Sequence, residues 1–121
     1  MQVSGISYEI HTGIKSSCTT DEVGAFTGVS GEYRVQNVKI NGEALDLTKT
    51  YSLVGNNYIL LGGGNGMSMF EGCKVLERDV KLDNQALMDY IVETLGGSVG
   101  EEYADPYGQG RIVIVGGEAE N

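Results

Sequence analysis

The fold is decided by YRVQNVKINGEALD, residues 33–46, in which a run of alternating apolar and polar residues leads into an Asn-Gly pair. The apolar positions, with a slip of one residue after the second, are Tyr33, Val35, Val38 and Ile40. A period of two is typical of a β-strand. Asn41-Gly42 is the strongest short-range signal for a β-hairpin. The stretch therefore predicts a strand that ends at this turn and returns through Ala44 and Leu45.

Three further strands are predicted outside this hairpin. QVSGISYEIH, from Gln2 to His11, carries apolar residues near a period of two, and KTYSLVGN, residues 49–56, has the same spacing. RIVIV, from Arg111 to Val115, is nearly all β-branched, which fits a strand in the middle of a sheet. Residues 12–32 are rich in Gly, Ser and Thr and predict mainly loop, in which only VGAFTGV, residues 23–29, could pair as an edge segment.

One clear helix is predicted, in LDNQALMDYIVETLGG. Asp83 is a candidate N-cap, and Gly96-Gly97 stops the helix after Leu95. Apolar residues recur at three- and four-residue steps and form a stripe that we expect to face a core: Leu87, Tyr90, Ile91 and Leu95. Strands on both sides of this helix predict an α+β fold, a mixed β-sheet with a hairpin and one main covering helix from Asp83 to Leu95.

Length and charge restrict the class of protein. The chain has 121 residues, 40% of them hydrophobic, which is enough for one domain. We expect no membrane span, because no run approaches the roughly 18 apolar residues that one needs, and the N-terminus lacks the pattern of a signal peptide. The net charge of −9 repels phosphate polymers, so we expect no nucleic acid partner. Cys18 and Cys73 are either joined by one disulfide bridge or both unpaired. His11 is the sole histidine, and one histidine does not make a metal site.

The stretch NNYILLGGGNGMSMF, residues 56–70, holds four glycines within five positions. Such a loop could cradle a phosphate with its N–H groups, but no Lys-Ser or Lys-Thr pair follows it as a P-loop requires. It could instead be a tight turn whose glycines permit left-handed geometry. A third interpretation is a nucleoside site, in which Tyr58 stacks on a base and Asn65 forms hydrogen bonds to it.

A family resemblance is carried by three stretches, QVSGISYEI, RVQNVKINGEALDLTKTYSLVGNNYILLGGGNGMSMF and GRIVI. Together they resemble the C-terminal domain of the 5′-nucleotidases, a family that includes UDP-sugar hydrolases and 2′,3′-cyclic-nucleotide phosphodiesterases. The most specific piece is VKINGEALDLTKTYSLVGNNY running into GGNG, because family members carry a similar strand, turn, strand and Gly-Gly-Asp-Gly loop in that order. The resemblance covers nearly all of residues 1–121 and implies a partial domain that opens downstream of the family's first helix and strands.

The resemblance also implies a set of substrate-binding residues. Tyr58 matches an aromatic residue that stacks on the base, although the loop is one residue longer between that ring and the Gly-Gly motif. Asn65 stands where the family usually has an aspartate, so a neutral amide replaces a charged acceptor. Gly63, Gly64 and Gly66 match glycines that let the backbone approach the ligand. From the residues alone, Tyr58 as a core ring and Asn65 as a left-handed turn residue remain alternatives.

In that family a metallophosphatase domain with two metal ions performs the hydrolysis, whereas the C-terminal domain holds the nucleoside. Residues 1–121 contain nothing that resembles the metallophosphatase domain, and one histidine cannot supply a two-metal cluster. We therefore expect no catalytic residue, no metal ligand and no cofactor in this chain. Divalent metal ions are expected in the metallophosphatase domain of the parent protein, which would be a partner of this chain.

Two classes of function follow from the resemblance. The first is the nucleoside- or nucleotide-binding portion of a 5′-nucleotidase-like phosphoesterase, extracellular or on the cell surface. The second is a non-catalytic adhesion or assembly module derived from that domain. Because one helix covers only one face of a sheet, the sequence also predicts a symmetric homodimer formed through a strand edge or an apolar face. A monomer in which the loop around Cys18 covers the gap is the alternative.

Overall fold

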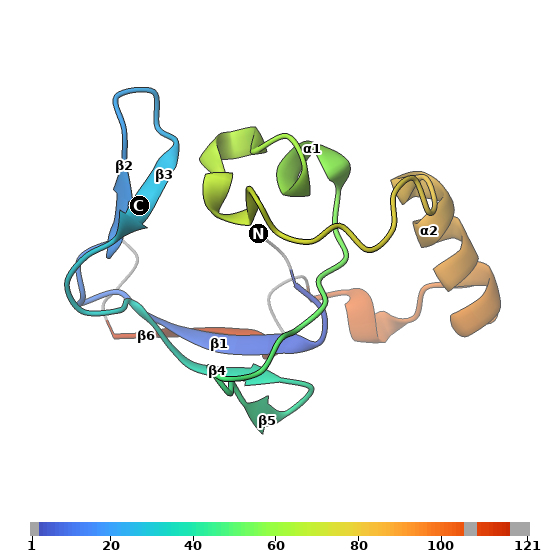
Figure 1. The fold of residues 1–121 in the computed structure, drawn as a ribbon. Helices are drawn as coiled ribbons and strands as arrows, with labels where there is room; N and C mark the ends of the chain where they lie inside the picture. The colour runs from blue at the N-terminus through green and yellow to red at the C-terminus, as the bar shows by residue number, and fades with distance from the viewer. Residues whose placement is uncertain (1–2, 106–108, 117–121) are drawn as a thin grey trace.

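A computed structural model describes residues 3–105 and 109–116 (Figure 1). The strands are β1 (Ile6–His11), β2 (Cys18–Thr20), β3 (Phe26–Val29), β4 (Val35–Ile40), β5 (Glu43–Ala44) and β6 (Ile112–Val115). The helices are α1 (Asn57–Leu60) and α2 (Asp83–Asp89), and shorter helical turns cover Gly64–Gly66, Ser68–Phe70, Tyr90–Thr94 and Glu101–Tyr103. A mixed sheet beside one main helix confirms the predicted α+β class.

The main sheet has the strand order β5-β4-β1-β6. β1 pairs antiparallel with β4 on one side and parallel with β6 on the other, so the first and last strands lie side by side. The turn between β4 and β5 has positive φ at both central residues, 51° at Asn41 and 85° at Gly42, which is the geometry that suits a two-residue hairpin. The predicted Asn-Gly hairpin is therefore confirmed.

The slip in the alternation of residues 33–40 is a β-bulge. Ser7 pairs with Lys39 and Glu9 pairs with Gln36, so two residues of β4 lie opposite one residue of β1. Asn37 lies in this bulge with φ of 50° and donates its Nδ2 hydrogen to Glu9 Oε2 at 2.7 Å. Nε2 of His11 lies 2.9 Å from the same oxygen. The hydrogen bonds from His11 and Asn37 hold the pKa of Glu9 below its usual value.

The other predicted strands differ from the structure in extent or place. β1 begins at Ile6 because Gly5, with φ of 72°, breaks the extended run, and Gln2 lies outside the described residues. Residues 49–56 form no strand, so that prediction is wrong. The segment alternates apolar and polar residues but pairs with neither the four-stranded nor the two-stranded sheet. Residues 23–29 do supply a strand, β3, which pairs with β2.

β6 confirms the strand predicted near the C-terminus but lies at the edge of the described sheet, so the prediction of a central position is wrong. Within the described residues it pairs only with β1. Its two middle side chains, Val113 and Ile114, are 44% and 64% exposed. Consecutive strand residues point to opposite faces, so both faces of this strand are open.

The helix occupies the predicted range with two local differences. Its N-cap is Leu82 rather than Asp83, and Asp83 instead accepts a hydrogen bond from the N–H of Asn84 at 2.8 Å. After Asp89 the chain continues as a π-helical turn and stops at two glycines with φ of 70° and 92°, Gly96 and Gly97. The predicted stop is confirmed.

The predicted contact of the helix stripe with a core is wrong. Leu87 is 60% exposed, and Figure 1 shows α2 beyond one end of the four-stranded sheet, while the β2–β3 hairpin rises at the other end. Among residues 3–105 and 109–116 no hydrophobic side chain is buried. Cys18 and Cys73 are free and exposed, which decides between the two cysteine alternatives. Ladder and turn hydrogen bonds, rather than a closed core, define this arrangement.

We expect Gly42→Ala to destabilise the chain by about 1 to 2 kcal/mol, because an L-residue with a Cβ is strained at positive φ. Gly13→Ala is the matched control: a Cβ meets nothing within 4 Å at either glycine, but only Gly42 has positive φ. Urea unfolding followed by circular dichroism measures both. Equal midpoints for the two variants would contradict the assigned turn.

Candidate functional site

The candidate site begins with the single helical turn α1, which positions Tyr58. Oδ1 of Asn56 accepts a hydrogen bond from the N–H of Tyr58 at 2.8 Å, as an N-cap side chain does. At the other end the N–H groups of Leu61 and Gly62 donate to the carbonyl of Asn57 at 2.9 and 3.2 Å. Hydrogen bonds thus cap this helical turn at both ends, and the glycine loop follows it directly in sequence.

The ring of Tyr58 lies against the backbone of Gly64. A Cβ added at Gly64 would overlap three carbons of the ring, so only glycine allows this approach. Gly64 is the one buried residue in the described part of the chain, whereas Tyr58 is 60% exposed. Tyr58 is therefore not a core ring: one part of it rests on the loop and the rest is open to a ligand.

The glycine loop, residues 62–66, has left-handed backbone geometry at three positions. The φ values are 62° at Gly63, 55° at Asn65 and 75° at Gly66. Asn65 therefore has the left-handed conformation expected of it if it is a turn residue. Its side chain is exposed and makes no hydrogen bond to the residues that the structure describes. A turn residue and a ligand-binding residue are compatible here, because the backbone makes the turn and leaves the amide open.

The loop also contacts the β2–β3 hairpin, which sequence reasoning did not connect with it. Oγ of Ser68 donates a hydrogen bond to the carbonyl of Phe26 at 2.5 Å, across 42 positions of sequence. A Cβ added at Gly66 would overlap the carbonyl oxygen of Gly24 at the hairpin tip. No local pattern in the sequence marks Ser68 or Gly24, since the signal is a contact between distant segments.

The five predicted substrate-binding residues thus share one structural unit. Tyr58 and Gly64 are in contact, and the loop joins Gly63, Asn65 and Gly66 directly to them. The unit consists of an exposed aromatic ring, an exposed amide and a backbone without side chains at three positions. Such a surface can stack on a flat ring and form hydrogen bonds to its edge.

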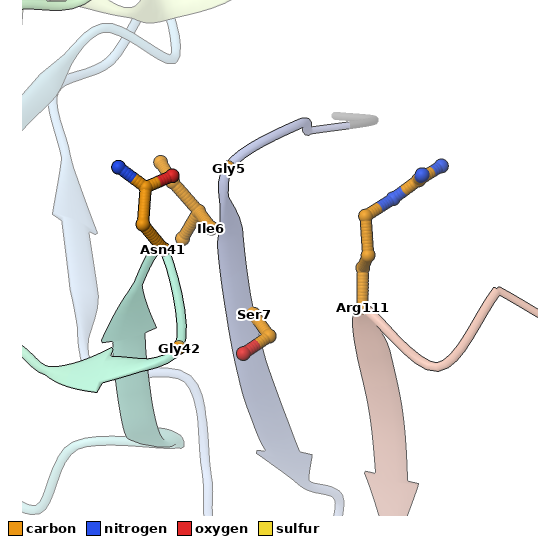
Figure 2. Close-up of a pocket in the computed structure, with 6 residues that line it drawn as sticks. All are labelled: Gly5, Ile6, Ser7, Asn41, Gly42 and Arg111. Atoms are coloured by element: carbon orange, nitrogen blue, oxygen red, sulfur yellow. The ribbon is translucent and has the colours of Figure 1, made fainter.

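A separate open pocket lies at the end of the main sheet, where β1 and β6 begin. Its volume is about 170 Å³, and it is lined by Gly5, Ile6, Ser7, Asn41, Gly42 and Arg111. Figure 2 shows the side chains of Asn41 and Arg111 on opposite sides of Gly5. None of the five predicted site residues lines this pocket, so it does not belong to the glycine loop.

Within residues 3–105 and 109–116, no group of three or more His, Cys, Asp or Glu side chains could hold a metal ion. His11 lies beside Glu9 on β1 rather than in such a group. None of the described helices has the length and apolar composition needed to cross a bilayer.

Comparison with known proteins gives one family. Residues 1–72 match the family described as 5′-nucleotidase, C-terminal domain, which is more than half of the 121 residues. The matched stretch includes β1 to β5, Tyr58 and the whole glycine loop, and it ends before α2 and β6. No curated protein and no solved structure gives a match.

We expect Gly64→Ala to move the ring of Tyr58 off the loop, because the new methyl group would occupy the position of the ring carbons. In NMR spectra the contacts between the Tyr58 ring and residue 64 should disappear and the ring signals should shift. Gly13→Ala adds a methyl group in open space and should leave them unchanged. Persistence of the ring contacts in Gly64→Ala would show that the ring does not rest there.

Proposed function

The chain belongs to the 5′-nucleotidase C-terminal domain family, and we propose that its glycine loop binds the nucleoside part of a nucleotide. The observation that carries the proposal is the ring of Tyr58, which is 60% exposed and rests on Gly64, next in sequence to the exposed Asn65. An exposed aromatic ring that already rests on the loop backbone is a preformed stacking surface. Little side-chain freedom is then lost when a base binds.

Each residue of the loop has a role in this proposal. The open face of Tyr58 stacks on the base, and the amide of Asn65 donates and accepts hydrogen bonds at the base or the ribose. Gly63, Gly64 and Gly66 keep side chains out of the way of the ligand. Asn65 provides a weaker acceptor than the aspartate usual in the family, because a neutral oxygen lacks the charge assistance of a carboxylate.

The division of labour with a second domain is also part of the proposal. The chain carries a net charge of −9, which repels the phosphate end of a nucleotide but not its uncharged nucleoside end. We assign hydrolysis to a metallophosphatase domain with divalent metal ions and no catalytic step to this chain. The parent protein would then be an extracellular or cell-surface enzyme of nucleotide breakdown.

Titration of the chain with adenosine, followed by calorimetry, tests the site. Tyr58→Ala should weaken binding by about 1 to 3 kcal/mol, the usual contribution of one stacked base. Asn65→Asp should strengthen binding, because the carboxylate restores a charge-assisted acceptor. Tyr33→Ala is the matched control, since Tyr33 is also an exposed tyrosine, at 63%, but lies before β4. Equal affinities for the wild type, Tyr58→Ala and Asn65→Asp would leave the loop as a structural turn.

A role in assembly is a second candidate function, favoured by the exposed apolar side chains and by the open edge of β6. An edge strand presents unpaired N–H and C=O groups to any neighbouring strand. Two copies of β6 related by a twofold axis would pair antiparallel and extend the sheet across both chains. This pairing would produce the homodimer that the sequence predicts.

Light scattering at several concentrations tests the homodimer, which should have twice the chain mass of 12.9 kDa. Ile114→Lys should shift the chain toward the monomer, because a charged side chain on the edge strand opposes pairing. Ile114 is 64% exposed, so the substitution removes little packing within one copy. Val54→Lys is the control, at a 94% exposed residue outside both sheets. A mass of 12.9 kDa at every concentration would exclude the homodimer.

A further inference from the structure

We infer that the β2–β3 hairpin is a working part of the nucleoside site and that Ser68 is the positioning residue that connects it to the glycine loop. This inference rests on the proposed function. Ser68 itself need not contact the ligand. Its hydroxyl group would act through the loop, by fixing the backbone that presents Asn65 and supports Tyr58.

The connection between hairpin and loop has two contacts. The first is the hydrogen bond from Oγ of Ser68 to the carbonyl of Phe26, 2.5 Å long and partly buried. The second is the close approach of Gly66 to the carbonyl oxygen of Gly24, where no Cβ fits. The first contact is a directional hydrogen bond and the second is a steric restriction. The two contacts are separated by two residues in the loop segment, from Gly66 to Ser68, and by two in the hairpin, from Gly24 to Phe26. Together they fix the position of the loop backbone relative to β3.

The hairpin can hold the loop in one position because hydrogen bonds within residues 21–25 fix the conformation of its own turn. Oδ1 of Asp21 accepts hydrogen bonds from the N–H groups of Val23 at 3.0 Å and Ala25 at 2.8 Å. The backbone of Asp21 forms two more hydrogen bonds. Its N–H donates to the carbonyl of Ala25 at 2.9 Å, and its carbonyl accepts from the N–H of Gly24 at 3.1 Å. Local side-chain caps of this kind define a turn without help from a core. The carbonyl that meets Gly66 is therefore held in place.

The glycine loop needs contacts with another segment because its glycines allow its backbone to adopt many conformations. Residues 63, 65 and 66 have positive φ, and glycine at two of these positions populates many other conformations. On one side the loop is fixed by α1 and by the ring of Tyr58 on Gly64. On the other side it is fixed by the hairpin through Gly66 and Ser68. Asn65 lies between these two anchors, so the direction of its amide depends on both.

The test compares four versions of the full chain: wild type, Ser68→Ala, Ser68→Thr and Thr48→Ala. In Ser68→Ala the dissociation constant for adenosine should rise about two- to tenfold, as expected for one lost hydrogen bond. Ser68→Thr keeps the hydroxyl group and should retain most of the affinity. Thr48→Ala is the matched control, because it removes another hydroxyl group that forms a hydrogen bond, to Asp46 at 2.7 Å, outside the loop and hairpin. It should bind as the wild type does.

Amide hydrogen exchange gives a readout that does not depend on adenosine. The N–H of Met67 donates to the carbonyl of Gly64 within the loop, and its exchange should accelerate in Ser68→Ala. The N–H of His11, which donates to the carbonyl of Arg34 in the main sheet, should be unaffected and so report that the fold is intact. Accelerated exchange at both amides would mean general unfolding and would overturn the assignment of a local role.

The possible failures are distinguishable. If the wild type binds adenosine and Ser68→Ala binds equally well, the hairpin has no role in the site although the proposed function survives. If the wild type does not bind adenosine, the proposed function fails, and with it the inference that the hairpin serves a nucleoside site. Unchanged exchange at Met67 in Ser68→Ala would, with or without binding, show that Ser68 does not fix the loop.

Discussion

Backbone hydrogen bonds along β1 hold together segments that are far apart in the chain. β1 is the only strand of the described sheet with one antiparallel and one parallel neighbour, β4 and β6. No hydrophobic side chain in the described residues is fully buried, and the residues of β1 itself are half-buried. The position of β5, of its turn and of the pocket beside Arg111 all follow from the register along β1.

Local chemistry allowed several of these features to be predicted from sequence. Asn41-Gly42 required a hairpin turn because both residues accept positive φ. The slip in the alternation before it was visible in the sequence, but the bulge that it marks was not predicted, and the Asn37 side chain there donates to Glu9, 28 positions away. Gly96-Gly97 ended the helix for the same conformational reason. At the hairpin turn and at the end of the helix, the residues that determine the structure are neighbours in sequence.

Features that depend on distant partners could not be predicted in the same way. Residues 49–56 have the period of a strand, but a strand also needs a neighbour to receive its hydrogen bonds. The β-branched run of β6 indicated a strand but not its position in the sheet. The family resemblance brought together Tyr58 and the glycines of the loop, whereas the hydrogen bond from Ser68 to Phe26 leaves no trace in any local pattern.

The parallel pairing of β1 with β6 has a consequence for the order in which the chain can fold during synthesis. β4 follows β1 closely in sequence, so their ladder closes a short loop, whereas the pairing of Tyr8 with Ile112 closes nearly the whole chain. Contacts of such high contact order form late, because the entropy of closure precedes any gain from pairing. Until the ribosome has released residues 112–115, one side of β1 remains an unpaired edge that chaperones or other nascent chains can reach.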